Sequence, residues 1–216
     1  MEAQNIASEI ENKKEEIISG IRFISGSIYG KEVVTAVCGV GKVFAAACAE
    51  AMILRYSPDE IINVGVAGSL VPRLHVFDAV LASDLCQHDM DTSALGDEPG
   101  LISGINMVKF PASLRINTAL EACLVSNETH FITGTIASGD CFVADPAKKA
   151  YINRQFGAVA CEMEGAAIAQ VCYINNVEFA VLRSISDENG GDYEKFARRA
   201  ADNSAAVIRE YLKLDK

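Results

Sequence analysis

The sequence predicts an α/β sandwich with a largely parallel central sheet. Stretches typical of buried strands alternate with helical stretches along the 216 residues, and several strands end in glycine-containing turns. Half of the residues are hydrophobic, which is enough for a sizeable core. Because no repeat of 20–50 residues and no Pro- or Gly-rich linker divides the chain, residues 1–216 are expected to form a single domain.

The first half of the chain begins with isoleucines spaced among charged residues, which favours an amphipathic helix. Gly30-Lys31 separates two short apolar runs and predicts a hairpin turn. An alanine-rich helix opens after Gly41 and ends at Ser57-Pro58. In order, we expect a helix over 2–18, strands over 21–30 and 31–40, a helix over 42–56, a strand over 60–70 and another strand from residue 78.

The second half opens with a long loop over 92–111, which holds three glycines and two prolines. Asp145-Pro146 is a strong helix start, with Asp as the N-cap and Pro in the first position. After the loop we expect a helix over 113–126, a strand over 129–140, a helix from 146, a strand and helix within 157–172, a strand over 178–187, a polar loop over 188–192 and an amphipathic helix from about 193.

The composition excludes several classes of protein. The net charge of −10 and the lack of a Lys/Arg cluster argue against nucleic acid as a partner. Seven scattered cysteines without a CxxC pair favour free thiols in a reducing cytoplasm over a disulfide framework. No Cys/His group has zinc-ligand spacing, and no apolar run is long enough for a membrane span.

Four strand ends carry polar groups: "GVAGS", "ASGDCF", "CEMEG" and "RSISDENG". In open α/β sheets ligands bind beyond the carboxyl ends of the strands, so these groups are expected to converge on one cleft. None of the glycines belongs to a dinucleotide or triphosphate motif, and each could be a simple turn glycine. The run His88-Asp89-Met90-Asp91 lacks a diagnostic metal spacing.

Asp187 ends a strand on the same face as Arg183. It is either an N-cap or simple Arg–Asp partner, or an acid that gives a proton to a ligand. Glu162 and Glu164 stand at a strand–helix junction, where one carboxylate can serve the helix start and the other can accept hydrogen bonds from two vicinal hydroxyls. Phe142 is either a core aromatic or a stacking platform for a flat heterocycle.

Six segments in this order and spacing resemble the 5′-methylthioadenosine/S-adenosylhomocysteine nucleosidases, which have the nucleoside phosphorylase fold. The segments are "CGVGKVFAAA", "NVGVAG", "QHDMDTSALG", "SGDCF", "CEMEG" and "RSISD", and the likeness runs from about residue 20 to the C-terminus. The resemblance implies a three-layer α/β/α sandwich with a mixed, largely parallel sheet. It also implies an enzyme that hydrolyses the N-glycosidic bond of methylthioadenosine and S-adenosylhomocysteine, as in methionine salvage, without a metal or cofactor.

The resemblance also implies roles for individual residues. Glu164 would bind the ribose hydroxyls while Met163 packs under the sugar and Glu162 supports the site. Phe142 and the backbone of Val143 would hold the adenine.

The expected catalytic acid is Asp187, which would protonate N7 so that adenine leaves as a neutral molecule. Ser186 would orient Asp187, Gly68 would lie near the ribosyl and water region, and Arg183 belongs to the expected binding set. A homodimer is also implied, in which residues near the loop 92–111 cap the partner's site.

Water is the expected nucleophile rather than phosphate. Related phosphorylases hold phosphate with arginines and a serine, whereas the matching places here are Asn63 and Val66. A purine nucleoside phosphorylase, a deoxyfutalosine-type nucleosidase and a catalytically silent nucleoside-binding homologue are the alternatives.

One departure concerns the start of the chain. The family opens with an apolar strand that leads into a Met-Glu-rich turn, and the last Glu of that turn activates the water. Here the first strand is lacking and the position of the base falls on Gln4, with Glu2 placed outside the site. Glutamine can orient a water but cannot deprotonate it, so reduced activity is expected.

Overall fold

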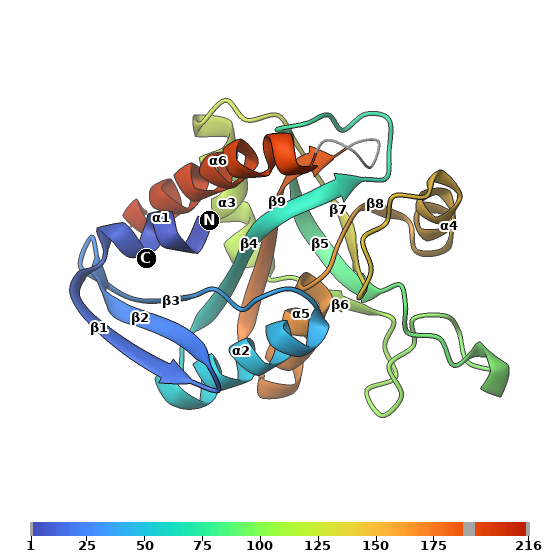
Figure 1. The fold of residues 1–216 in the computed structure, drawn as a ribbon, viewed down its shortest axis with the longest axis horizontal. Coiled ribbons are helices and arrows are strands. Elements are labelled where there is room, and N and C mark those ends of the chain that lie inside the picture. Colours follow the sequence, from blue (N-terminus) through green and yellow to red (C-terminus); the bar gives the residue numbers. More distant parts are fainter. Residues whose placement is uncertain (1, 188–192, 215–216) are drawn as a thin grey trace.

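The computed structural model describes residues 2–187 and 193–214, and Figure 1 shows that they form a layered α/β fold with helices on both faces of a mixed sheet. The predicted fold class is therefore confirmed, while the polar loop expected over 188–192 lies outside the described residues. In chain order the elements are α1 (Glu2–Glu9), β1 (Glu11–Ile18), β2 (Ile21–Ile28), β3 (Lys31–Ala36), α2 (Lys42–Tyr56), β4 (Glu60–Ser69), β5 (Ala79–Gln87), the 3₁₀ turn η1 (Ser93–Leu95), β6 (Lys109–Pro111), α3 (Leu114–Ser126), β7 (Phe131–Ser138), α4 (Pro146–Phe156), β8 (Ala158–Glu162), α5 (Gly165–Asn175), β9 (Glu178–Asp187) and α6 (Tyr193–Lys213).

Within the described residues the strands form two sheets. A three-stranded antiparallel sheet has the order β1-β2-β3, and a six-stranded sheet has the order β6-β5-β7-β8-β4-β9. In the larger sheet the pairs β4–β9, β5–β7 and β7–β8 are parallel. An additional antiparallel pairing of β5 with β9 brings the two sides of this sheet together, so the ends of its central strands are held close to one another.

Apolar residues fill both faces of the larger sheet. On one face, Val181 of β9 packs in a cluster with alanines of α2 and α5, such as Ala49 and Ala169. On the other face, Leu182 packs in a cluster that includes Leu120 of α3 and residues of α1 and α6. Successive residues of β9 therefore face opposite helix layers, as the period of two in a strand requires.

The helix expected over 2–18 is wrong in its second half. Helix α1 ends at Glu9, and residues 11–18 form the edge strand β1, which pairs antiparallel with β2. Ile10 is buried against the α6 layer, whereas Ile17 is 72% exposed, so the isoleucine spacing does not mark one helical face. The many charges on this stretch suit an edge strand, which must avoid pairing with other chains.

Several local predictions are confirmed. The predicted hairpin between β2 and β3 is present, but its turn is Tyr29-Gly30, both with positive φ, rather than Gly30-Lys31, because Lys31 already pairs with Ile28 as the first residue of β3. Asp145 caps α4 by accepting a hydrogen bond from the Ala147 amide, with Pro146 in the first turn. The stretch 92–111 is largely a loop, although it also contains η1 and the short strand β6.

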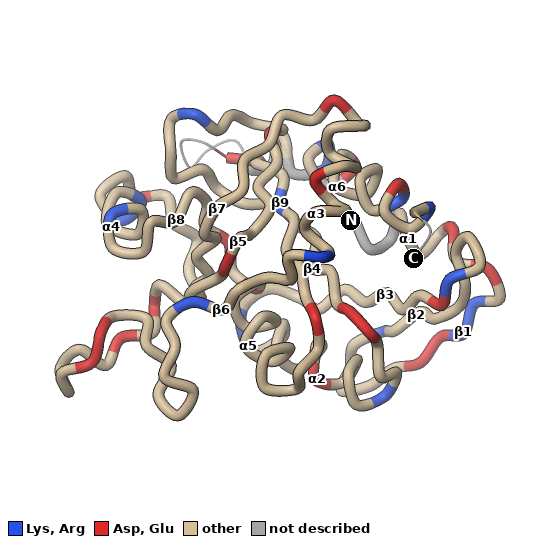
Figure 2. Tube along the Cα trace, turned by 180° about the vertical axis from the view of Figure 1, so that it is seen from behind, with Lys and Arg blue, Asp and Glu red and all other residues tan. Residues whose placement is uncertain are grey.

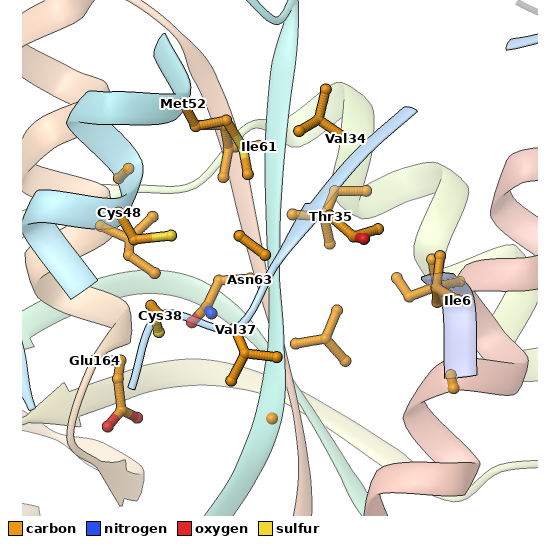
Figure 3. Close-up of a pocket in the computed structure, with 18 of the residues that line it drawn as sticks. Ile6, Val34, Thr35, Val37, Cys38, Cys48, Met52, Ile61, Asn63 and Glu164 are labelled. Atoms are coloured by element: carbon orange, nitrogen blue, oxygen red, sulfur yellow. The ribbon is translucent and has the colours of Figure 1, made fainter. Parts of the chain in front are cut away.

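The two sheets are separated by a gap between β3 and β4. Within the described residues β3 pairs only with β2, and β4 pairs with β9 along its length and with β8 only at its end. A cavity of about 1500 Å³ extends between these two strands, and apolar side chains such as Val34, Met52 and Ile61 line it (Figure 3). Ile6 of α1 lies at the opposite side of this gap. This is the place where an additional strand would find two free edges.

We predict that an apolar strand placed between β3 and β4 stabilises the fold. The test compares two N-terminal extensions of equal length, one of Val and Ile residues and one of Gly and Ser residues. We expect the apolar extension to raise Tm by roughly 6–12 °C. The reason is that its strand would add roughly three net hydrogen bonds at about 1 kcal/mol each. Equal Tm values for the two extended chains would show that the gap does not accept a strand.

Candidate active site

One end of the cavity is formed by the strand ends of the larger sheet together with the loop after β3. The predicted site residues that line the cavity are Gly68, Phe142, Val143, Glu162, Met163, Glu164, Arg183, Ser186 and Asp187. The side chain of Gln4 lies outside the described residues, so only the backbone position of this residue, within α1, is known. The four strand ends singled out in the sequence thus meet at one place.

Gly68 stands at the centre of this meeting point. Its register pairs it with Cys161 of β8 on one side and with Asp187 of β9 on the other. A Cβ built on Gly68 would lie 3.7 Å from the Cys161 Sγ and 3.9 Å from the Asp187 Oδ2. Because glycine has no side chain, Gly68 leaves this space beside the Asp187 carboxyl group to the cavity.

Glu162 is the carboxylate that supports the start of α5. Its Oε2 accepts hydrogen bonds from the amides of Glu164, at 3.0 Å, and Gly165, at 2.8 Å. Its Oε1 accepts a hydrogen bond from the hydroxyl of Ser138 at the end of β7. Because helix N-terminal amides have no partner within the helix, Glu162 serves as the cap that the α5 start needs.

Arg183 is the charge partner of Glu162, and both side chains are almost completely buried. The guanidinium donates to Glu162 Oε2 and also donates to Asn63 Oδ1 at 2.5 Å. Gly65 makes room for it, because a Cβ at that position would lie 2.8 Å from the Arg183 Nη1. The pair therefore links β4, β8 and β9. The charged partner of Arg183 is Glu162 rather than Asp187, which was considered as an Arg–Asp pair from the sequence.

Glu164 has a different environment although it lies only two residues away. Its Oε1 accepts a hydrogen bond of 2.9 Å from the Gly41 amide, in the turn between β3 and α2. The carboxylate lines the cavity close to Cys38, and in Figure 3 it points into the open space. Because Glu162 already caps α5, Glu164 keeps acceptor capacity for a ligand.

The pKa values of the two glutamates move in opposite directions. Burial acts to raise the pKa of Glu162, but the Arg183 charge and hydrogen bonds from Ser138, Arg183 and Gly165 outweigh it, so the pKa is lowered. Burial, followed by the nearby Glu162 charge, raises the pKa of Glu164. Glu162 is thus a fixed anion, whereas Glu164 responds to its surroundings.

Asp187 and Ser186 end β9 at the cavity, and both are buried. The Lys149 ammonium of α4 lies 3.3 Å from the Asp187 Oδ2. The Cys161 thiol lies nearby, and burial raises its pKa to about 12, so it is neutral at physiological pH. Asp187 is therefore held in a largely dry pocket wall, as a group that exchanges a proton with a ligand requires.

A network around Lys42 was missed by the sequence reasoning. The Lys42 Nζ donates to Asp89 Oδ1 at 2.7 Å and to Gln87 Oε1 at 3.0 Å, and its amide donates to Asp140 Oδ1 at 2.7 Å. The Asp140 amide in turn donates to Asp89 Oδ2. These contacts fasten the turn after β3 to the ends of β5 and β7. The only sequence signal was that all three loops carried segments of the family resemblance.

The aromatic and apolar wall suits a flat heterocycle. Phe142 is 56% exposed and lines the cavity, whereas Val143 beside it is buried. An aromatic ring that stays exposed at a cavity wall can stack on a ligand, which favours the platform interpretation of Phe142 over the core interpretation. Phe142 and the carboxyl groups of Glu164 and Asp187 line the same cavity.

Comparisons with known proteins agree with this arrangement. Residues 1–213 match the family model described as "Phosphorylase superfamily". The 5′-methylthioadenosine/S-adenosylhomocysteine nucleosidase of Shewanella sediminis is 35% identical over 212 residues, which cover 96% of this chain and 92% of that protein. The chain belongs to this nucleosidase family.

Solved structures of this nucleosidase family superpose closely on the chain. The Neisseria meningitidis nucleosidase in complex with methylthio-immucillin-A has a TM-score of 0.94 at 31% identity, with 98% of this chain and 94% of that chain covered. A futalosine hydrolase of Helicobacter pylori has a TM-score of 0.92 at 31% identity, with 98% and 91% covered.

We predict that Glu162→Gln destabilises this nucleosidase strongly, because it leaves the buried Arg183 charge without its partner. The expected loss is about 3–5 kcal/mol in the free energy of unfolding, measured by urea denaturation. The stabilising effect of the lowered pKa is fully present above pH 4.5 and is lost as the pH falls below it, so the difference between parent and variant shrinks in acid.

The matched control for this prediction is the double variant Glu162→Gln/Arg183→Met, which removes both charges. It should recover part of the loss. If the double variant loses more free energy of unfolding than the two single variants lose together, the pairing is contradicted.

Proposed function

We propose that this chain hydrolyses the N-glycosidic bond of 5′-methylthioadenosine and S-adenosylhomocysteine, and releases adenine and the 5-thioribose product. The observation that carries the proposal is that Asp187 and Glu164, the groups expected to serve base and sugar, line one cavity in a chain of this nucleosidase family. The Helicobacter and Neisseria relatives reach TM-scores above 0.9, which supports the use of a common site.

Proton transfer to the base is the central step. Asp187 gives its proton to N7 of adenine while the bond between C1′ and N9 breaks, so the electron pair of that bond leaves on a neutral purine. The sugar then carries positive charge as an oxocarbenium-like species, which nearby carboxylates stabilise. Water adds to C1′ and loses a proton.

The sugar and the 5′ substituent need different surroundings. Glu164 accepts hydrogen bonds from the two ribose hydroxyls, and the Gly41 amide holds its other oxygen in place. Met163 lines the same cavity and packs under the sugar, and Gly68 leaves space beside C1′. The 5′-thio group has an apolar surface and needs a pocket without charge.

Hydrolysis is favoured over phosphorolysis by the partners of Arg183. This guanidinium is engaged by Glu162 and Asn63, so it is not available to hold phosphate. Val66 provides no hydrogen bond donor from its side chain. Phosphate would therefore lack the charge-assisted contacts that it requires.

The deoxyfutalosine-type activity is a second candidate, because a futalosine hydrolase is among the close structural matches. The two activities differ in the group at the 5′ position and share the same chemistry at C1′. A panel that offers methylthioadenosine, S-adenosylhomocysteine and a futalosine-type nucleoside distinguishes them by relative kcat/KM.

The proposal also covers the partners of the enzyme and its location in the cell. Figure 2 shows the Lys and Arg residues of the described chain in short separate segments, and the net charge of −10 argues against nucleic acid as a partner. In the described part of the chain no helix is long and apolar enough to cross a membrane. Seven free cysteines suit a reducing cytoplasm, and Leu95, 84% exposed in the loop 92–111, suits contact with a second copy in a homodimer.

The proposed function predicts adenine release from methylthioadenosine, followed by chromatography. Because Gln4 stands at the position of the general base, the chain as written should turn over roughly 10²–10⁴-fold more slowly than its Gln4→Glu variant. Asp187→Asn in the same background should bind the nucleoside and release no adenine. Absence of adenine from the Gln4→Glu variant would overturn the proposed function.

The raised pKa of Glu164 predicts weaker nucleoside binding in acid. The ionised carboxylate accepts two hydroxyl hydrogen bonds, and this acceptor form is lost as the pH falls through a pKa that lies above 4.5. Calorimetric titration of methylthioadenosine between pH 8 and 5 measures the effect.

The control ligand for this titration is the 2′,3′-dideoxy analogue, whose affinity should not share the acid-induced loss. In Glu164→Gln the two ligands should behave alike at every pH. An identical pH dependence for both ligands in the parent would refute a role of Glu164 in holding the hydroxyls.

A further inference from the structure

A buried lysine stands directly behind the proposed catalytic acid. The Lys149 Nζ lies 3.3 Å from the Asp187 Oδ2, and the two side chains are 11% and 3% exposed. Lysine is almost never buried unless it is paired with an opposite charge. The carboxyl group of Asp187 provides that charge once it has lost its proton, and a contact of this kind in a dry environment has a much larger effect than one at the surface.

The position of Lys149 is set by the packing of α4 rather than by the ligand. The helix begins at the Asp145 cap, and the Lys149 amide donates to the Asp145 carbonyl in its first turn. Ile152 and Phe156 on the following turns pack in a cluster with Cys161 of β8. Lys149 is therefore held by a fixed helix.

Lys149 reaches Asp187 from outside the cavity. Asp187, Ser186 and Cys161 line the cavity, whereas Lys149 is not among its lining residues. The ammonium can thus act on the carboxyl group without a contact to the nucleoside. The titratable groups that the described residues place against Asp187 include this lysine from α4 and the neutral Cys161 thiol from β8.

Proton donation by Asp187 leaves a negative charge that this ammonium can stabilise. When Asp187 passes its proton to N7, a neutral acid becomes a carboxylate inside a dry wall, where an unpaired anion is costly. A cation 3.3 Å away stabilises that anion as it forms.

We propose that Lys149 is a positioning residue for the reaction: its ammonium fixes the Asp187 carboxyl group and stabilises the anion that proton donation leaves. The inference rests on the proposed function, because it assigns the proton donor to Asp187. It adds a residue that no feature of the sequence singled out.

The experiment replaces the lysine with a neutral side chain of similar length and uses its neighbour as the control. Lys149→Met removes the charge, Lys149→Arg keeps it, and Lys148→Met removes an exposed charge whose Nζ contacts Cys141 instead. All variants are made in the chain as it stands and in the Gln4→Glu background. Thermal unfolding shows whether each variant is folded.

The first readout does not depend on activity. Carbon NMR of the aspartate carboxyl groups, with Asp187→Asn to assign the signal, reports the surroundings of the Asp187 carboxyl group directly. In Lys149→Met the chemical shift of this signal should change relative to the parent at one fixed pH, because the cation 3.3 Å away is gone. In Lys148→Met and Lys149→Arg the signal should stay where it is in the parent.

The second readout is the rate of adenine release in the Gln4→Glu background. Lys149→Met should lower kcat roughly 10-fold or more, as a part of what an acid catalyst contributes, and leave KM within about two-fold. Lys149→Arg should restore much of the rate.

The two readouts separate the possible failures. If no variant releases adenine but the Asp187 carboxyl signal moves in Lys149→Met alone, the proposed function is wrong and the pairing stands. If Lys149→Met gives the same Asp187 signal and the same rate as Lys148→Met, the role of Lys149 is overturned. A Lys149→Met protein that is folded but loses affinity rather than kcat would also overturn it.

Discussion

The site depends on one buried ion pair, between Glu162 and Arg183. Burial of two charges is costly, and here the cost is offset by a full set of partners: two amides of α5, the Ser138 hydroxyl and the Asn63 side chain. Because these partners come from β4, β7, β8 and β9 or the helix after β8, the pair fixes the relative positions of four strands. The proposed ligand-binding groups stand at or just after the ends of these strands.

The same pair explains how two glutamates separated by one residue have different tasks. Glu162 takes the capping role and the positive charge, so its own charge is permanent. That fixed charge, together with burial, raises the pKa of Glu164. Glu164 is consequently an acceptor whose affinity for hydroxyl groups can be modulated. The Met163 between them lines the cavity, so a three-residue turn supplies support, an apolar surface and a binding group.

Sequence reasoning predicted what depends on local pattern and failed where distant segments decide. Alternating strands and helices, the Asp145 cap and the Gly30 turn were readable because each signal lies within a few residues. Residues 11–18 were misassigned because a charged edge strand and a polar helix face have similar composition, and only pairing with β2 separates them. Likewise, Glu162 and Glu164 were recognisable as a pair, but their partners Arg183 and Gly41 lie far along the chain in opposite directions, so their roles could not be divided from the sequence.

The split between the two sheets places an unusual demand on the Lys42 network. Gly41, whose amide binds Glu164, lies in the turn after β3, a strand of the smaller sheet. Glu164 follows β8, a strand of the larger sheet. Within the described residues no strand pairing joins the two sheets, so the hold on this turn must come from elsewhere. Lys42 supplies it through Asp89, Gln87 and Asp140. A strand between β3 and β4 would also hold this turn in place. It would fill the part of the cavity that extends from the site to Ile6 of α1. In the described residues, the geometry around Glu164 rests in part on Lys42 and Asp89, whose side chains are 19% and 27% exposed, whereas both side chains of the buried pair are 2% exposed.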